Sequence, residues 1–131
     1  MTLLYIKKYT RAYIKAHPDW LFVFGDNLAR EGFGGQAKEA RGEPNAVGIA
    51  TKRLPDMTPG AFLTDDDLEI WRASERDVLA TLWEEAKRGR TIVWPLDGIG
   101  TGLARLEQKA PEIWNELEQY RMWIDGAEAR S

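Results

Sequence analysis

Apolar residues fall along the chain in two alternating patterns. Short runs rich in β-branched and aromatic residues end at polar, glycine or proline positions, which is typical of buried strands. These runs are Leu3–Tyr9, Leu21–Gly25, Ala46–Thr51 and Thr91–Pro95. Between them, apolar residues recur at helical spacing. The alternation predicts strands separated by helices.

Three stretches carry helix signals. Gln36–Arg41 consists of good helix formers and is followed by Gly42, a residue that commonly ends a helix. Thr64 opens the strongest signal, because an acidic first turn follows it and apolar residues then recur as far as Lys87. A final amphipathic helix is expected over about residues 106–117.

The remaining segments carry weaker signals. Tyr13 and Ile14 suit either a short helix or an edge strand before Pro18, which disfavours a helical conformation at the residue before it. Pro55–Pro59 is rich in turn formers and has no periodicity. Residues Gly126–Ser131 are expected to fray.

Two glycine-bearing loops each follow a β-type run. They are Gly32–Ala37 and Asp97–Leu103. Such loops at strand ends present main-chain N–H groups to phosphate oxygens. The carboxyl ends of the strands in an α/β sheet share one edge, so both loops are expected to meet at one ligand cleft. The alternative is that the glycines only permit tight turns.

Neither loop fits a nucleotide motif of fixed spacing. The first lacks the third glycine of the dinucleotide fingerprint, and no Gly-Lys-Ser/Thr completes a P-loop. The sequence therefore predicts neither a Rossmann domain nor a P-loop enzyme.

Composition limits the chemistry further. The 131 residues, 44% of them hydrophobic, suit one packed domain over residues 1–131. With no cysteine and one histidine, His17, the chain cannot build disulfides, thiolate nucleophiles, cysteine-based metal sites or an all-histidine zinc site, which leaves Asp and Glu as the only ligands for a catalytic metal. Neither a metal nor a cofactor is predicted. His17 is given no catalytic role. The chain has no apolar run of about 18 residues and no charged-then-apolar leader, which predicts no membrane partner and a cytoplasmic location.

Charge gives a local signal only. The net charge of −3 does not indicate nucleic-acid binding through the overall field. Basic residues near the first loop form either a local patch or a solvated rim. They are Arg30, Lys38, Arg41, Lys52 and Arg53.

Four short motifs, in this order, resemble those of macro domains, a family of ADP-ribose-binding α/β modules. They are Phe24–Asn27, Gly32–Ala37, Ile49–Lys52 and Ile99–Leu103, within a match over about residues 22–117. The closer resemblance is to the branch of terminal ADP-ribose protein glycohydrolases and DNA ADP-ribosyl glycohydrolases, which carry a Thr-Lys after the third motif and an Ile-Gly-x-Gly-Leu loop. The chain also resembles small phage-encoded macro-like proteins of unassigned function.

The resemblance implies a compact α/β fold with a mixed sheet flanked by helices. It implies a ligand, ADP-ribose or a related NAD-derived nucleotide, and partners in the form of ADP-ribosylated protein or DNA. Asn27, Gly34 and Gly35 would lie near the distal ribose, and Gly100–Leu103 around the diphosphate. Asp26 would accept a hydrogen bond from a sugar hydroxyl or an adenine amine, although an Asp-Asn pair after a strand is also a common turn former. The ligand-binding candidates are Asp26, Asn27, Gly32, Phe33, Gly34, Gly35, Gln36, Thr51, Gly98, Ile99, Gly100, Thr101, Gly102 and Leu103.

Two residues are catalytic candidates, Lys52 and Asp97. The resembling glycohydrolases use a lysine at the Thr-Lys position to attack the anomeric carbon, which requires a neutral amine, and Arg53 could supply the neighbouring positive charge that favours one. Those enzymes carry an acidic residue after the Gly-x-Gly-Leu loop, where this chain has Ala104. Asp97 is the nearest carboxylate and could activate water or the lysine, or simply cap a turn.

Aromatic residues admit two interpretations. Phe33, Trp94 and Trp20 could stack on a base or line a sugar pocket, although most aromatics are expected in the core. Phe33 is the exception, because it stands between loop glycines.

The sequence leaves three functional hypotheses: an ADP-ribosyl hydrolase, a binder without turnover, or a structural domain whose Trp-rich helices form an interface.

Overall fold

The computed structural model describes residues 3–102 and 104–127. Its centre is a four-stranded sheet in the order β1-β4-β2-β3, and every neighbouring pair of these strands is parallel. The strands are β1 (Leu3–Ile6), β2 (Leu21–Asn27), β3 (Ala46–Lys52) and β4 (Ile92–Pro95). The single antiparallel contact described is an isolated bridge between Lys52 and Phe62. The α/β class and the single compact domain are confirmed.

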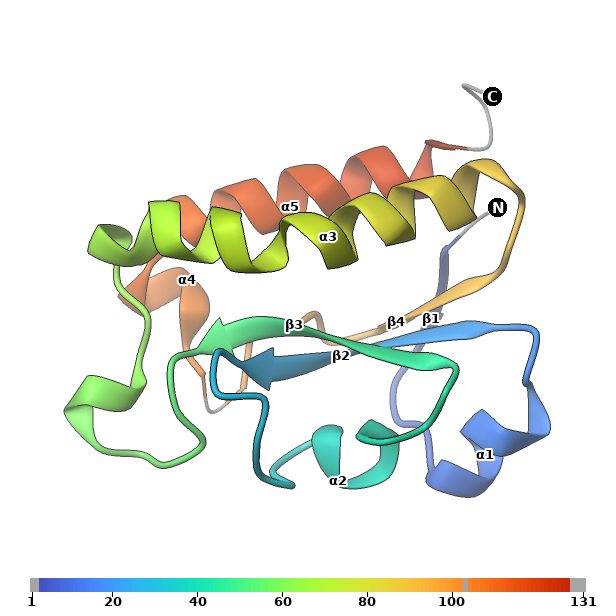
Figure 1. The fold of residues 1–131 in the computed structure, drawn as a ribbon, viewed down its shortest axis with the longest axis horizontal. Coiled ribbons are helices and arrows are strands. Elements are labelled where there is room, and N and C mark those ends of the chain that lie inside the picture. The colour runs from blue at the N-terminus through green and yellow to red at the C-terminus, as the bar shows by residue number, and fades with distance from the viewer. Residues whose placement is uncertain (1–2, 103, 128–131) are drawn as a thin grey trace.

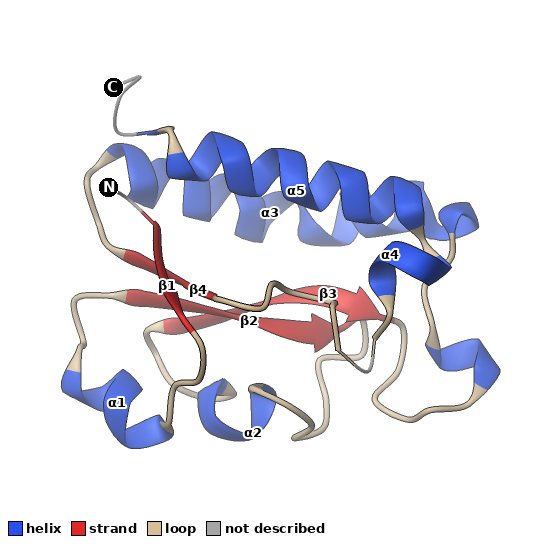
Figure 2. Cartoon of the chain, turned by 180° about the vertical axis from the view of Figure 1, so that it is seen from behind, coloured by secondary structure: helices blue, strands red, loops and turns tan. Residues whose placement is uncertain are grey.

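Helices cover both faces of the sheet (Figure 1). The long helices α3 (Leu68–Lys87) and α5 (Pro111–Asp125) lie side by side over one face, and the short helices α1 (Arg11–Ala16) and α2 (Ala37–Ala40) lie on the other. Seen from behind in Figure 2, α4 (Leu106–Lys109) lies beside the ends of β2 and β3 that carry the arrowheads. These are the carboxyl ends of the strands.

Two apolar clusters hold the layers together. The larger one packs the sheet against α3 and α5 and includes the fully buried Trp71 and Trp94. The smaller one packs α1 and α2 against the other face and includes Tyr9 and Phe22. The Tyr9 hydroxyl donates a hydrogen bond to the Val23 carbonyl, and burial raises the pKa of Tyr9.

Several predicted boundaries are corrected by the structure. β1 ends at Ile6 and not at Tyr9, because Tyr9 leaves the sheet to enter the smaller cluster. β2 continues through Asp26 and Asn27, so this pair belongs to the strand and does not form a turn. The segment around Tyr13 is a helix, capped at its start by the Thr10 side chain.

The last helical stretch is divided in two. Ala110 has a non-helical backbone (φ −144°, ψ 69°) before Pro111, which begins α5, so α4 and α5 are separate helices. The expected fraying is wrong at Ala127, which is fully buried in the larger cluster, while residues 128–131 lie outside the described part of the chain. The two 3₁₀ turns Pro59–Ala61 (η1) and Asp65–Asp67 (η2) lead into α3.

No helix among residues 3–102 and 104–127 is both long and apolar enough to cross a bilayer.

Candidate functional site

A cleft of about 340 Å³ lies at the carboxyl ends of the strands. Both glycine loops line it, together with the ends of β2, β3 and β4. Its volume falls within the range of small-molecule sites, roughly 300–1,000 Å³. The lining residues are Gly25, Asp26, Asn27, Glu31, Gly32, Gly34, Gly35, Gln36, Ala37, Arg41, Thr51, Lys52, Pro55, Met57, Pro95, Gly98, Ile99, Gly100, Gly102 and Ala104.

The second loop is fixed to β3 by close backbone packing at Gly100. This residue has φ +80°, and a Cβ added there would lie 2.8 Å from Leu106 Cβ and 3.2 Å from Thr51 Cγ2. Only glycine adopts this positive φ and leaves room for Leu106 and Thr51 without strain. Gly100 also accepts a hydrogen bond at 2.8 Å from the Leu106 N–H, which connects the loop to α4.

Main-chain donors are abundant along both loops. Among the described residues, none accepts a hydrogen bond from the N–H groups of residues 32–36 or 99–102. Gly34, Gly35 and Gly102 have no other atom within 4 Å of where a Cβ would stand, so their backbones face open space. Unpaired N–H groups of this kind around a concave surface are suited to bind an anion.

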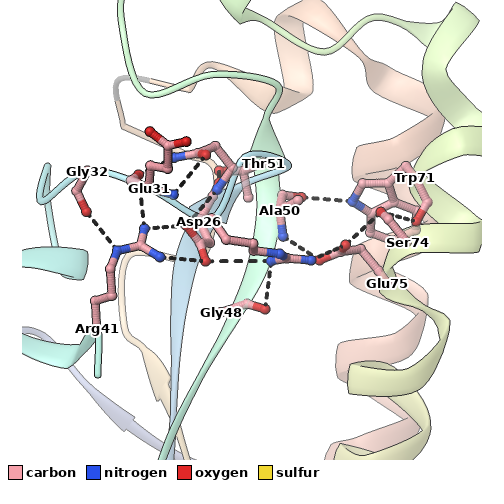
Figure 3. A network of polar contacts seen from close by, with 12 residues as sticks. Asp26, Glu31, Gly32, Arg41, Gly48, Ala50, Thr51, Trp71, Ser74 and Glu75 are labelled. Atoms are coloured by element: carbon pink, nitrogen blue, oxygen red, sulfur yellow. Dashed lines mark hydrogen bonds and ion pairs between the residues drawn. The ribbon is translucent and has the colours of Figure 1, made fainter. Parts of the chain in front are cut away.

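The polar side chains at the end of β2 are, in contrast, already paired. Asn27 donates from Nδ2 to the Glu31 carbonyl at 2.8 Å, and Thr51 donates from its hydroxyl to the Asp26 carbonyl at 3.2 Å. The Asp26 carboxylate accepts from Arg41 Nη2 at 2.5 Å, from Arg41 Nη1 at 3.3 Å and from the Asn27 N–H at 2.8 Å. Figure 3 shows the Arg41 guanidinium beside Asp26.

The same network continues to α3 through Arg30. This arginine lies 3.6 Å from Asp26 Oδ2 and donates to Glu75 Oε2 at 2.5 Å. Glu75 is fully buried and also accepts from the Ala50 N–H at 2.6 Å and from the Ser74 hydroxyl at 2.7 Å. Trp71 completes the connection by donating from its indole to the Ala50 carbonyl at 2.8 Å (Figure 3).

Lys52 lines the cleft and is only 9% exposed. Its Nζ donates to the Asp56 carbonyl, lies 3.4 Å from Met57 Sδ and stands 5.1 Å from the centre of the Phe62 ring. Arg53 points elsewhere, since its guanidinium pairs with Asp67 at 2.5 Å and donates to the Gly60 carbonyl. The positive charge expected from Arg53 is therefore already compensated.

Three other candidates do not line the cleft. Asp97 is exposed, and its carbonyl accepts a hydrogen bond at 2.7 Å from the Thr101 hydroxyl, which also lies outside the lining. Phe33 is 65% exposed and absent from the lining as well. Leu103 lies outside the described residues, and the remaining ligand-binding candidates all line the cleft.

The other aromatic candidates belong to the interior. Trp94 is completely buried in the larger cluster, so it cannot stack on a ligand. Trp20 packs against the smaller cluster, and the His17 ring stacks on it at 4.0 Å between centroids. The five basic residues near the first loop do not form a free patch, because Arg30, Arg41 and Arg53 are held in ion pairs.

The sequence did not indicate several residues of the site. Pro55 and Met57 come from a connection without periodicity, and Arg41 was expected only as part of a basic patch or a solvated rim. Glu75 lies on the long helix, and its signal was a charged residue at a position that faces the sheet. No three His, Cys, Asp or Glu side chains within the described residues are grouped as a metal site would require.

The comparison with protein families gives one match. A model described as "Family of unknown function (DUF7831)" matches residues 4–120. The chain belongs to this family. No curated protein and no solved structure matches it significantly. The matched range includes both loops and the whole of the cleft lining.

Proposed function

We propose that the cleft binds ADP-ribose or a related NAD-derived nucleotide through the main-chain N–H groups of its two glycine loops. The observation that supports this most strongly is the convergence of the two loops on one cleft at the carboxyl ends of β2, β3 and β4. A cleft in this position also argues against the interpretation in which the glycines serve turns only.

The balance of donors and acceptors favours an anionic ligand. The loop N–H groups are unpaired among the described residues, whereas the Asp26 carboxylate is covered by Arg41 and Arg30. Lys52 adds a cationic nitrogen at the wall of the cleft. A diphosphate offers several acceptor oxygens in a row, which suits the unpaired N–H donors of two loops that line one cleft.

Binding without turnover is favoured over hydrolysis. Ala104 lines the cleft at the position where the resembling glycohydrolases carry an acid, and Asp97 is exposed outside the lining. Arg53 is neutralised by Asp67 and so does not provide Lys52 with an uncompensated positive charge. A binder of this kind, acting in the cytoplasm, would sequester a NAD-derived nucleotide or bind ADP-ribosylated protein or DNA.

Hydrolysis is the second candidate function, because Lys52 lines the cleft. Incubation with ADP-ribosylated protein and with ADP-ribosylated DNA tests it. We expect no product release. Release that is lost in Lys52→Ala but kept in Lys38→Ala, an exposed lysine near the same loop, would establish catalysis by Lys52.

Isothermal titration calorimetry tests the binding proposal directly. ADP-ribose is titrated into the full chain, with AMP and ATP as controls. We expect saturable heat with ADP-ribose and weaker binding of AMP, which lacks the second phosphate and the distal ribose. Absence of heat at millimolar ADP-ribose would reject the proposal.

A further inference from the structure

The Asp26 carboxylate is enclosed on every side that the structure describes. Its side chain is 4% exposed, although the residue belongs to the cleft lining. Oδ1 accepts from Arg41 Nη2 and from the Asn27 N–H, and Oδ2 faces Arg41 Nη1 and Arg30 Nη1. A carboxylate has about four lone-pair positions; three hydrogen bonds fill three of them, and the Arg30 guanidinium stands 3.6 Å from Oδ2 at the fourth.

Gly48 closes the remaining side. A Cβ on Gly48 would lie 2.6 Å from Asp26 Oδ2 and 2.7 Å from Asp26 Cβ, so the β3 backbone packs directly against the carboxylate. A ligand donor could reach Asp26 only by displacing one of the two guanidinium groups. Displacing Arg41 would break charge-assisted hydrogen bonds, and displacing Arg30 would break an ion pair, in each case to form one new hydrogen bond.

Arg41 spans the gap between Asp26 and the first loop. It donates from Nε to the Gly32 carbonyl at 2.7 Å and from Nη2 to the Glu31 carbonyl at 3.1 Å, while its other contacts hold Asp26 (Figure 3). In a planar peptide the C=O of one residue and the N–H of the next point in opposite directions. With the Glu31 and Gly32 carbonyls turned toward Arg41, the N–H groups of Gly32 and Phe33 point away from it and stay unpaired.

We propose that Asp26 is a positioning residue that holds Arg41, and through it the first loop, and that the cleft selects the ribose-diphosphate part of its ligand without a carboxylate that binds the amine of the base. The ligand class is then nucleoside diphosphate ribose, whichever purine it carries. This inference rests on the proposed function, and it departs from the expectation that Asp26 accepts an adenine amine.

Glu31 is the other carboxylate in the lining. Its side chain belongs to an exposed residue, so a hydrogen bond from a base amine would compete there with water and add little affinity. No other carboxylate lines the cleft among the described residues.

The test compares ADP-ribose with inosine diphosphate ribose. In the latter, an oxygen replaces the 6-amine of the base, and a carboxylate repels this oxygen. A hydrogen bond from the amine to a charged acceptor would favour ADP-ribose by about tenfold or more. We expect dissociation constants within about twofold of one another, since no such bond forms. A tenfold preference for ADP-ribose would overturn the inference and leave the proposed function standing. Failure of both ligands to bind would reject the proposed function, and the inference with it.

Two variants separate positioning from recognition. In Asp26→Asn and in Arg41→Met we expect both ligands to lose affinity together, with the ratio between them still near one. A variant that weakens ADP-ribose alone would contradict the positioning role. Arg72→Met is the matched control, because Arg72 holds Glu116 through paired hydrogen bonds on an exposed surface outside the cleft lining, and it should leave both affinities unchanged.

Discussion

Gly34 is a residue at which the cleft can be probed with little disturbance of the fold. It lines the cleft, no atom lies within 4 Å of its would-be Cβ, and its φ lies outside the left-handed region that strains other residues. Gly60 shares the open surroundings and the ordinary backbone but lies in η1, outside the cleft lining. The pair therefore separates occupancy of the cleft from any general effect of adding a side chain.

In Gly34→Val the isopropyl group should stand in the space that the ligand uses. We expect affinity for ADP-ribose to fall about tenfold or more, equivalent to about 1.4 kcal/mol, as measured by calorimetry. The free energy of unfolding should change by no more than about 0.5 kcal/mol. Gly60→Val should leave affinity unchanged, and an equal loss in both variants would count against Gly34 as a ligand contact.

The sequence indicates the loop glycines but not the ion pairs of the side chains around them. Turn-forming loops after strands are visible in the pattern, and most of their residues do line the cleft. The role of Arg41 could not be seen, because its partner Asp26 is 15 residues away and becomes a neighbour only when α2, which Arg41 caps, packs against β2. The compensation of Arg53 by Asp67 escaped notice for the same reason.

Among the elements, β3 carries a specific constraint, since it lies at the edge of the sheet. At Ala50, side chains of α3 form the hydrogen bonds that a further strand would otherwise form. Glu75 accepts from the Ala50 N–H, and Trp71 donates to the Ala50 carbonyl. Arg30 covers the Gly48 carbonyl on the same edge at 3.2 Å. Edges satisfied in this way are protected from pairing with another chain.

Glu75→Ala should therefore destabilise the fold strongly. It leaves the Ala50 N–H and the Arg30 guanidinium without their buried acceptor, and we expect the free energy of unfolding to fall by about 2–4 kcal/mol in urea denaturation. Glu84→Ala on the same helix removes only an exposed pair with Lys87 and should cost no more than about 0.5 kcal/mol. Similar costs for the two variants would refute the edge role of Glu75.

The start of α3 gives a prediction on pH. Burial raises the pKa of Asp67, but the Arg53 guanidinium and the Thr64 N–H outweigh it and hold the pKa below its ordinary value of 3.8. A carboxyl with a lowered folded-state pKa stabilises the fold above its unfolded pKa, and this stabilisation is lost as the pH falls through the folded value.

Asp67→Ala should consequently cost about 1–2 kcal/mol at pH 7, through the lost cap and ion pair. The difference in the free energy of unfolding between Asp67→Ala and the wild type should become smaller as the pH is lowered from 3.8. Urea denaturation of both proteins from about pH 2.5 to pH 7 measures this difference. The lower limit of about 2.5 lies below the ordinary pKa range of aspartate. A difference that stays constant over this range would show that the charge of Asp67 does not contribute.

The elements themselves were largely predictable. Amphipathic spacing located α3, and β-type runs located the strands to within a few residues. The errors arose where tertiary contacts decide the boundary: Tyr9 enters a second core, and Asp26 extends β2 because its pairing partners lie on β3. The parallel direction of all four strands was not visible in a pattern of single runs.

At the scale of the whole molecule, strand order explains the position of the cleft. β4 lies between β1 and β2, so the loop after β4 emerges next to the end of β2, and β3 flanks β2 on the other side. Two loops separated by α3 in the sequence are thereby brought to one edge of the sheet (Figure 1). The cleft follows from the topology, and its main-chain donors follow from the glycines.

Amide chemical shifts in a titration of the ¹⁵N-labelled protein with ADP-ribose test the joint action of the loops most directly. If both loops hold one ligand, the resonances of Gly34 and Gly35 in the first loop and of Gly100 and Gly102 in the second should shift together and report one common dissociation constant, with Gly60 unmoved. Shifts confined to one loop, or two unrelated dissociation constants, would contradict it.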